Sequence, residues 1–259
     1  MAKKHGKTKK TPRTKSSKKN SPADISASPV VDALVEAADM TLTSNEVRPV
    51  HQLRVNCRRL DVWFRLAKLR PMRDELTWLR RSAGDVRDLD VLMTMDIPPG
   101  WERSLRMRRY HAHKRLKSVI EDERTTALIA AVSERRPTSY KQAVKVTQGL
   151  LDQVLRAGRK ISKASAEVED FHRVRIRVKR LRYALEWLGG STELLTEAQD
   201  LFGALNDVDM LLIQLRERPP KTMPEGYYEY CLEQLIDYME EIRQTWQKTS
   251  KALKKLRLG

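Results

Sequence analysis

Apolar residues recur at intervals of three and four along most of the chain, beginning near Pro29. Val31, Leu34, Val35 and Ala38 form the first such series, and this spacing places them on one face of an α-helix. The same periodicity returns in seven later segments: 47–69, 72–95, 101–133, 138–164, 168–189, 192–216 and 225–256. No segment alternates apolar and polar residues as a half-buried strand does. The pattern therefore predicts an all-α fold of long antiparallel helices.

Proline and glycine separate the helical segments. These breaks are Pro49, Pro71, Pro98-Pro99-Gly100, Pro137, Gly189-Gly190 and Pro219-Pro220. Such residues end helices and favour turns, so we interpret them as links between helices and not as catalytic loops. We expect one helical domain over 29–256, with halves of about 29–135 and 138–256.

Residues 1–28 have a different composition. Nine Lys or Arg residues there face a single acid, Asp24, and the stretch has almost no apolar residue larger than Ala. Such a segment cannot bury enough apolar surface to offset the entropy of ordering. We expect a disordered basic tail, which either aids solubility or binds a polyanion such as nucleic acid.

The charge of the whole chain narrows the class of partner. Lys and Arg number 51 against 34 Asp and Glu, a formal net charge of +17. A protein this basic attracts polyanions, whether nucleic acid, an acidic membrane surface or inorganic polyphosphate. Charge alone does not choose among these three.

Cysteine usage and hydropathy bear on the compartment. Cys57 and Cys231 are too few for a disulfide framework, and neither has the spacing of a metal ligand. No apolar run approaches the length of a membrane span, about 20 residues, and no apolar segment follows the basic N-terminus as in a secretory signal. We therefore expect a cytoplasmic protein without a structural metal, a cofactor or a membrane span; its oligomeric state stays open.

The most specific feature is an internal repeat with a period of about 120 residues. The segment from His51 to Leu60 aligns with that from His172 to Leu181, with His, Arg, a basic residue, Arg and Leu at identical spacing. A second pair of motifs follows in the same order, Gly84-Asp-Val-Arg-Asp88-Leu-Asp90-Val-Leu92 and Gly203-Ala-Leu-Asn-Asp207-Val-Asp209-Met-Leu211. The two pairs predict a duplicated helical unit.

Each His-containing copy places its cations on one helix face. At about 100° per residue, His172, Arg175, Lys179 and Arg182 share one side of their helix, opposite its apolar residues. The first copy repeats this arrangement with His51, Arg54, Arg58 and Arg65. If the two rows face each other, they line one positive groove or pore. A solvated basic face, paired to acids of neighbouring helices, is the alternative.

Phosphate is the ligand that these side chains suit best. Arg offers a planar fork of donors to phosphate oxygens, Lys a mobile charge, and a nearby phosphate favours the charged form of His. Four residues of the segment 101–133, together with Arg65, could add a further wall: Arg106, Arg109, His113 and Lys117. Four of the five tryptophans, Trp63, Trp78, Trp187 and Trp246, lie among apolar positions, which favours core packing over stacking on bases.

The paired aspartates receive a structural interpretation. Asp88 and Asp90, like Asp207 and Asp209, lie two residues apart, so on a helix their carboxylates point about 200° away from each other. That geometry is poor for sharing Mg²⁺. We expect them to pair with Arg from a packed helix or to orient the cationic row.

Both motif pairs resemble those of the CHAD (conserved histidine α-helical) domain, over about 30–256. The resemblance implies two four-helix bundles related by pseudo-twofold symmetry, a basic central channel that binds inorganic polyphosphate, and association with polyphosphate granules. By position, the anion-binding residues would be His51, Arg54, Arg58, Arg59, His172, Arg175, Lys179 and Arg182. Asp61 stands where the family commonly has Arg, so the second copy is the more faithful one. An ExExK strand motif, typical of the triphosphatase domains fused to many relatives, is missing from the sequence.

We therefore predict non-catalytic binding of polyphosphate in a channel lined by the two repeated helices. Two alternatives stay open. A basic helical protein could instead bind DNA or RNA, and an enzyme could hydrolyse phosphoanhydride bonds. Competition between polyphosphate and DNA distinguishes a polyphosphate-binding protein from a nucleic-acid-binding one. Release of phosphate in the presence of metal would identify an enzyme.

Overall fold

The computed structural model describes residues 23–258 and shows nine helices in that part of the chain. Their bounds are α1 Ser28–Thr43, α2 Val47–Leu66, α3 Met72–Leu92, α4 Glu102–Glu121, α5 Glu123–Ser133, α6 Tyr140–Ile161, α7 Val168–Trp187, α8 Glu193–Glu217 and α9 Tyr227–Lys255. The all-α prediction is confirmed. Only an isolated bridge between Ile25 and Thr138 has β geometry among the described residues.

Local side-chain chemistry starts several of these helices. At α6 the Ser139 side chain accepts a hydrogen bond from the Gln142 N–H, which satisfies one of the free donors of the first turn. At α7 Glu167 and Asp170 form a reciprocal capping box. Gly226, with φ of 73°, precedes α9 in a left-handed conformation that glycine adopts without steric cost.

The segment 101–133, expected to form one helix, forms two. The backbone of Asp122 is extended, with φ −68° and ψ 140°, and its side chain accepts a hydrogen bond from the Arg124 N–H. Asp122 therefore ends α4 and caps α5, because an aspartate competes with the helical backbone for N–H donors. The first half of the chain thus contains five helices, where the resemblance implied four.

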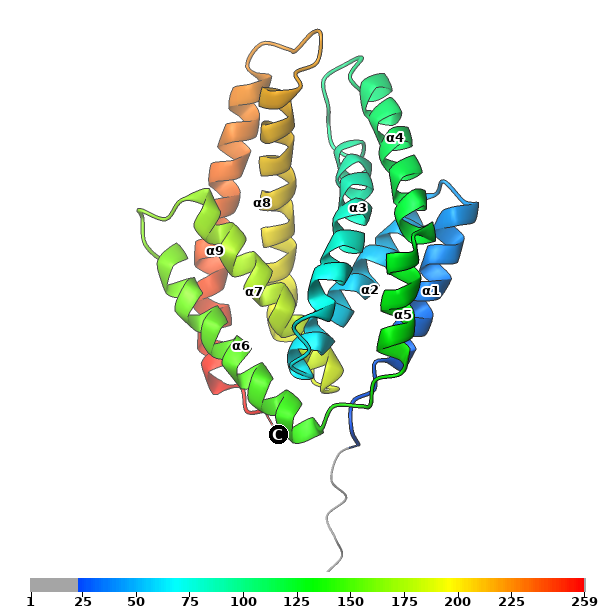
Figure 1. Ribbon diagram of the computed structural model, residues 1–259. Helices are drawn as coiled ribbons and strands as arrows, with labels where there is room; N and C mark the ends of the chain where they lie inside the picture. Colours follow the sequence, from blue (N-terminus) through cyan, green and yellow to red (C-terminus); the bar gives the residue numbers. More distant parts are fainter. Residues whose placement is uncertain (1–22, 259) are drawn as a thin grey trace, which may run out of the picture.

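The helices form two groups that meet along the middle of the molecule. Consecutive helices pack together within α1–α5 and within α6–α9, while α2 contacts α7 and α6, and α3 contacts α8. In Figure 1 the first group lies on the right and the second on the left, with α3 and α8 upright between them. The pseudo-twofold relation between the halves stays a prediction.

Large apolar side chains fill the core of both groups. Trp63, Phe64, Phe171 and Phe202 are fully buried, and Trp246 packs edge-on against Phe202. The expectation of core packing is therefore confirmed for Trp63 and Trp246. Their rings are unavailable for stacking on bases.

Ordered structure begins before residue 29, the predicted boundary between the tail and the helical domain. Ile25 exchanges two backbone hydrogen bonds with Thr138, and its carbonyl accepts a third from the Trp63 indole. This short segment is thereby fixed to the connection between the halves. The remainder of the predicted tail, residues 1–22, lies outside the described residues. Within the described part, none of the helices has the length and hydropathy of a membrane span.

Candidate functional site

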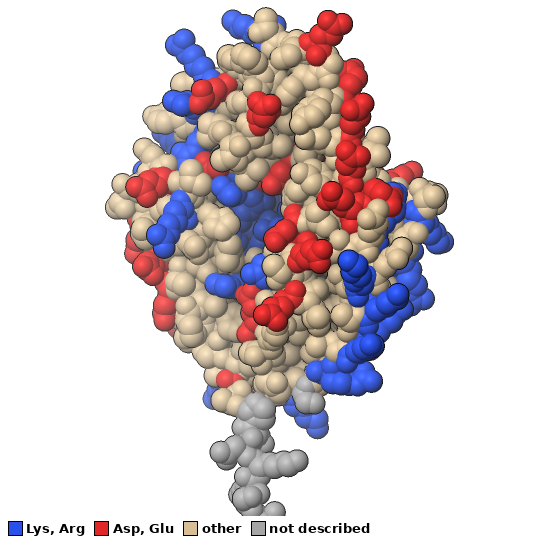
Figure 2. Space-filling view, turned by 180° about the vertical axis from the view of Figure 1, so that it is seen from behind, with Lys and Arg blue, Asp and Glu red and all other residues tan. Residues whose placement is uncertain are grey.

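The two repeated His/Arg helices meet at the centre of the molecule. Helix α2 packs against α7, and a small cavity of about 100 Å³ lies beside this contact. It is lined by Arg58, Asp61, Val62, Arg80, Arg175, Ile176, Lys179, Arg180 and Tyr183. Five of these nine residues are Lys or Arg and one is an acid, so the lining is strongly cationic. Seen from behind, the molecule has a hollow near its middle whose floor is formed by Lys and Arg side chains (Figure 2).

We refer to Arg54, Arg58, Arg80, Arg175 and Lys179 as the central cluster. Burial, followed by the charges of Arg175, Arg58 and Arg54, lowers the pKa of Lys179 to about 7. The pKa of Arg58 falls to about 10 for the same two reasons, burial first and then the charge of Arg54. Burial is the larger cause of both shifts and neighbouring cations the smaller one, while the excess of positive charge is shown by the lining itself.

Acids neutralise the central cluster only in part. Arg54 donates a hydrogen bond of 2.7 Å from Nη1 to Asp88 of α3, and the charge of Asp207 opposes the lowering of the Arg175 pKa. The Nε atoms of Arg54 and Arg175 are nevertheless buried without a hydrogen-bond partner among the described residues. A buried donor left unpaired costs free energy that a suitable acceptor would recover.

The two histidines have different surroundings. His51 is exposed at the start of α2, and partial burial, together with the charges of Arg87, Arg54, Arg58 and Lys179, lowers its pKa. His172 lies 2.9 Å from Asp209 of α8 through its Nε2 atom. His51 is therefore surrounded by cations, whereas His172 already has an anionic partner.

The flanking arginines of the predicted site are engaged with acids. Arg59 of α2 and Arg182 of α7 both contact Glu186, at 3.3 and 3.0 Å, and the Trp187 indole donates to the Arg59 carbonyl. The two contacts of Arg59 join the halves, whereas Arg182 and Glu186 both belong to α7. Arg59 and Arg182 thus form the edge of the site, with a carboxylate between them.

Asp61, which stands where the family commonly has Arg, has two partners. It contacts Arg65 at 3.2 Å and Arg73 at 3.0 Å. Burial alone would raise its pKa, but these two guanidinium groups outweigh burial and lower it. Asp61 therefore stays charged and neutralises one wall of the small cavity.

The expected pairing of the aspartate motifs with Arg holds for Asp88 and Asp90 of the first copy but not for the second, where Asp207 accepts a hydrogen bond from Asn206. Asp90 is buried and pairs with Arg109 of α4 at 2.5 Å, whereas its counterpart Asp209 pairs with His172. The repeat therefore preserves the acids and changes their partners. The described residues contain no group of three or more His, Cys, Asp or Glu placed to hold a metal ion.

Of the residues proposed as a further wall, Arg65 reaches the small cavity through Asp61, but the four on α4 do not lie at the central cluster. Arg106 pairs with Glu102 on the exposed side of α4, Arg109 turns to Asp90, and His113 is buried at 3% exposure. The Lys117 ammonium donates to the Leu42 carbonyl at 2.7 Å. Arg109 and His113 lie on the same face of α4 as Leu105, Ala112 and Leu116, and this face packs inward.

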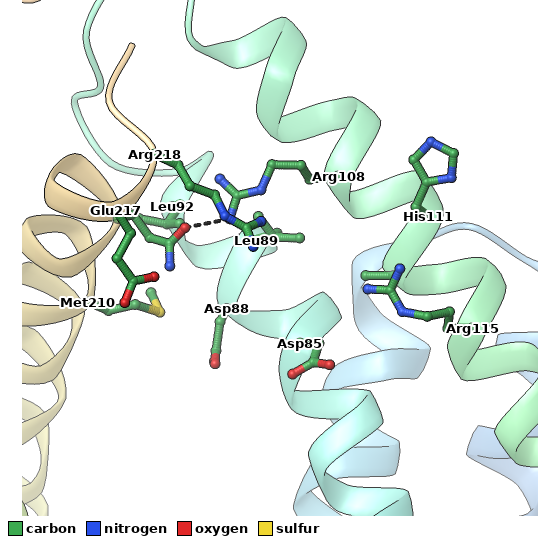
Figure 3. Close-up of a pocket in the computed structure, with 12 residues that line it drawn as sticks. Asp85, Asp88, Leu89, Leu92, Arg108, His111, Arg115, Met210, Glu217 and Arg218 are labelled. Carbon is green, nitrogen blue, oxygen red and sulfur yellow. Dashed lines mark hydrogen bonds between the residues drawn. The ribbon is translucent and has the colours of Figure 1, made fainter.

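Helix α4 instead presents Arg108 and Arg115, seven residues apart, to a larger cavity of about 540 Å³ between α3, α4 and α8. Figure 3 shows Asp85 and Asp88 of α3 projecting into it, with Glu217 and Met210 on the opposite side. The Arg108 guanidinium donates to Gln214 of α8 and so spans the cleft. This cavity is of mixed charge, and Asp88 connects it to the central cluster through Arg54.

Arg80 of α3 is a member of the central cluster that the sequence analysis missed. It belongs to a series at seven-residue spacing, Arg73, Arg80 and Arg87, which share one face of α3. Arg73 pairs with Asp61, Arg80 lines the small cavity, and Arg87 lowers the pKa of His51. The spacing was visible in the sequence, but these arginines lie outside the repeated motif.

The fold and the site define an all-helical protein whose two halves enclose an incompletely neutralised cationic cluster. The family model of the CHAD domain matches residues 27–216, and the chain therefore belongs to the CHAD domain family. A comparison with curated proteins gives no match.

Two solved structures share the fold. The CHAD domain from the plant Ricinus communis is similar with a TM-score of 0.65 and 20% sequence identity, over 91% of this chain and 94% of that one. PptA from Streptomyces chartreusis is similar with a TM-score of 0.59 and 16% identity, over 90% of this chain and 100% of that one. At these identities both show the fold alone.

Proposed function

We propose that the protein binds inorganic polyphosphate, without cleaving it, in a basic channel at the contact of α2 and α7. The observation that carries this proposal is the excess of buried positive charge in the central cluster, where the pKa of Lys179 falls to about 7. A phosphate chain would supply both the missing negative charge and acceptors for the unpaired Nε atoms of Arg54 and Arg175.

The surroundings of the cluster suit a linear ligand. Arg58 lines the small cationic cavity, and Arg54, one turn away on α2, contacts Asp88, which lines the larger cavity. Along α2, seven residues separate His51 from Arg58, roughly 10 Å at about 1.5 Å per residue. A chain of several phosphates fits that length better than a single phosphate does.

The binding residues in this proposal are His51, Arg54, Arg58, Arg59, His172, Arg175, Lys179 and Arg182, with Arg80 added from the structure. They supply hydrogen-bond donors and positive charge, the two properties that binding of a phosphate chain requires. Binding to a storage polymer would direct the protein to polyphosphate granules, which a fluorescent fusion would report.

The decisive variant reverses the charge of the central cluster. Arg175→Glu/Lys179→Glu should abolish binding of polyphosphate on filters, because it replaces two donors with anions that repel phosphate. Helicity by circular dichroism should stay at the wild-type value, which shows that the variant is folded. Unchanged affinity in the folded variant contradicts the proposal.

The matched control is Lys248→Glu/Lys251→Glu, which makes the same change of charge on the exposed surface of α9. It should reduce affinity by less than about threefold, because exposed charges act only at long range and are screened by salt. Long polyphosphate should also displace duplex DNA from the protein; the reverse result favours a nucleic-acid-binding protein. Steady release of phosphate with Mg²⁺ present favours an enzyme.

A further inference from the structure

A second basic pocket lies outside the central cluster, between α6 and α7. Its volume is about 480 Å³, and it is lined by Gln153, Arg156, Ala157, Lys160, Asp170, Arg173 and Arg177. We call it the outer pocket. It shares no residue with the small cavity beside α2, and its Arg173 and Arg177 stand where the first copy of the motif has Gln52 and Asn56.

The outer pocket holds four cations and one carboxylate. Asp170 is 2% exposed, and its Oδ1 atom is 2.8 Å from the Lys160 ammonium and 3.3 Å from the Arg173 guanidinium. Because Asp170 is fixed in the capping box of α7, it holds these two cations at the wall of the pocket. It neutralises only part of the positive charge.

Arg156 and Arg177 supply the remaining charge. Neither forms an ion pair with an acid within residues 23–258, and Arg177 donates instead to the Arg173 carbonyl at 3.0 Å. Arg156 is exposed on α6 and faces the same pocket. Two guanidinium groups are thus available to an anion, beside two cations that Asp170 positions.

The outer pocket is connected to the central cluster along α7. Arg177 lines the outer pocket, and Arg180, one turn further on, lines the small cavity. Residues three apart on a helix have Cβ atoms about 5–6 Å apart. The charge of Arg177 is one of the causes that, after burial, lower the pKa of Arg180 to about 10. Positive charge therefore continues from one pocket to the other.

We propose that the outer pocket is a second phosphate-binding site, and that one long polyphosphate chain occupies it together with the central cluster. This inference rests on the proposed function and adds that the protein prefers long polyphosphate chains to short ones. Contacts at a second site on the same chain are effectively intramolecular, so they raise the affinity for a polymer that reaches both sites. A short oligomer occupies only one of them.

The test compares two probes, tripolyphosphate and a polyphosphate of about 100 units, in three double variants. Arg156→Ala/Arg177→Ala removes the outer pocket, Arg58→Ala/Arg175→Ala removes part of the central cluster, and Lys248→Ala/Lys251→Ala is the charge-matched control on α9. Affinity is measured by calorimetry at several salt concentrations, with circular dichroism to verify folding. The affinity of the outer variant should fall about tenfold for the long chain and less than twofold for tripolyphosphate. The salt dependence of its affinity should become smaller for the long chain only.

The outcomes separate this inference from the proposed function. If the central variant binds both probes as the wild type does, the proposed function fails. The inference alone fails if the central variant loses affinity for both probes while the outer variant has the same affinity for the long chain as the α9 control. Equal losses of both probes in the outer variant also overturn it. So does an outer variant that loses affinity for duplex DNA and keeps affinity for long polyphosphate, because the pocket is then a nucleic-acid site.

Discussion

At the scale of single residues, Lys179 and its neighbours determine the chemistry of the site. Burial and three arginines oppose a charge on Lys179, and two arginine Nε atoms nearby lack acceptors in the described structure. Such an arrangement is costly for stability, because buried cations without partners lose hydration without compensation. Strongly shifted pKa values of this kind gather at functional sites.

Binding of polyphosphate should depend on pH through Lys179. Its pKa in the free protein is about 7, so the free protein loses this proton progressively as the pH rises through 7. A bound phosphate chain raises the pKa, and binding therefore takes up a proton in that range. We expect affinity for long polyphosphate to change by less than about twofold from pH 6.5 to 7 and to fall about tenfold between pH 7 and 8.5.

The control for this effect is Lys179→Arg, which keeps the positive charge but does not titrate in this range. It should bind with little change above pH 7, and calorimetry in buffers of different ionisation enthalpy should show that proton uptake is lost. An identical pH slope in Lys179→Arg would assign the effect to another group. His51 contributes in a different window, below pH 6.5, because its pKa is lowered from 6.5.

At the scale of helices, close packing at α6 and α9 holds the second half together. Gly158 of α6 lies against Trp246 of α9, and a Cβ added there would lie 2.2 Å from carbon atoms of the indole ring. The large ring is itself buried and cannot move aside cheaply. The glycine is therefore required by the approach of the two helices, although glycine weakens an isolated helix.

Gly158→Ala should lower the free energy of unfolding by about 1–3 kcal/mol, the usual cost of overpacking a core. The control is Gly149→Ala in the same helix, where an added Cβ meets nothing within 4 Å. This change should raise stability by about 0.5–1 kcal/mol, since alanine favours the helix. Urea unfolding measures both. Equal stabilisation by both changes would contradict the contact between α6 and α9.

At the scale of the whole molecule, the site depends on both halves. The central cluster takes Arg54 and Arg58 from α2, Arg80 from α3, and Arg175 and Lys179 from α7. Three side-chain contacts join the halves: Arg59 with Glu186, Trp187 with the Arg59 carbonyl, and Arg108 with Gln214. Neither half contains the cluster alone.

Deletion of residues 1–22 tests whether binding belongs to this site. The segment carries nine Lys or Arg residues, which attract polyanions without specific geometry. At 0.15 M salt the affinity of the shortened chain for long polyphosphate should be within about threefold of that of the full chain. At low salt, where long-range attraction counts most, the affinity of the shortened chain should fall further below that of the full chain. Loss of all binding at both salt concentrations would move the site to the tail.

The sequence by itself determined the helices and the cationic face of each repeated helix. Helical periodicity and turn residues act over a few positions, so six of the nine helices lie close to their predicted ranges: α2, α3, α6, α7, α8 and α9. The break at Asp122 was missed because one residue with a capping side chain gives little periodic signal. The order at Ile25 was missed because Thr138, its partner, is more than a hundred residues away.

The tertiary structure decided which charged faces meet and at what cost. Only packing brings Arg80 to the cluster, turns Arg109 and His113 of α4 inward, and gives Asp90 and Asp209 different partners. A helical wheel shows where a side chain points but not which helix it meets. The lowered pKa of Lys179 also depends on tertiary packing, because its causes are burial, Arg175 of the same helix, and Arg58 and Arg54 of α2.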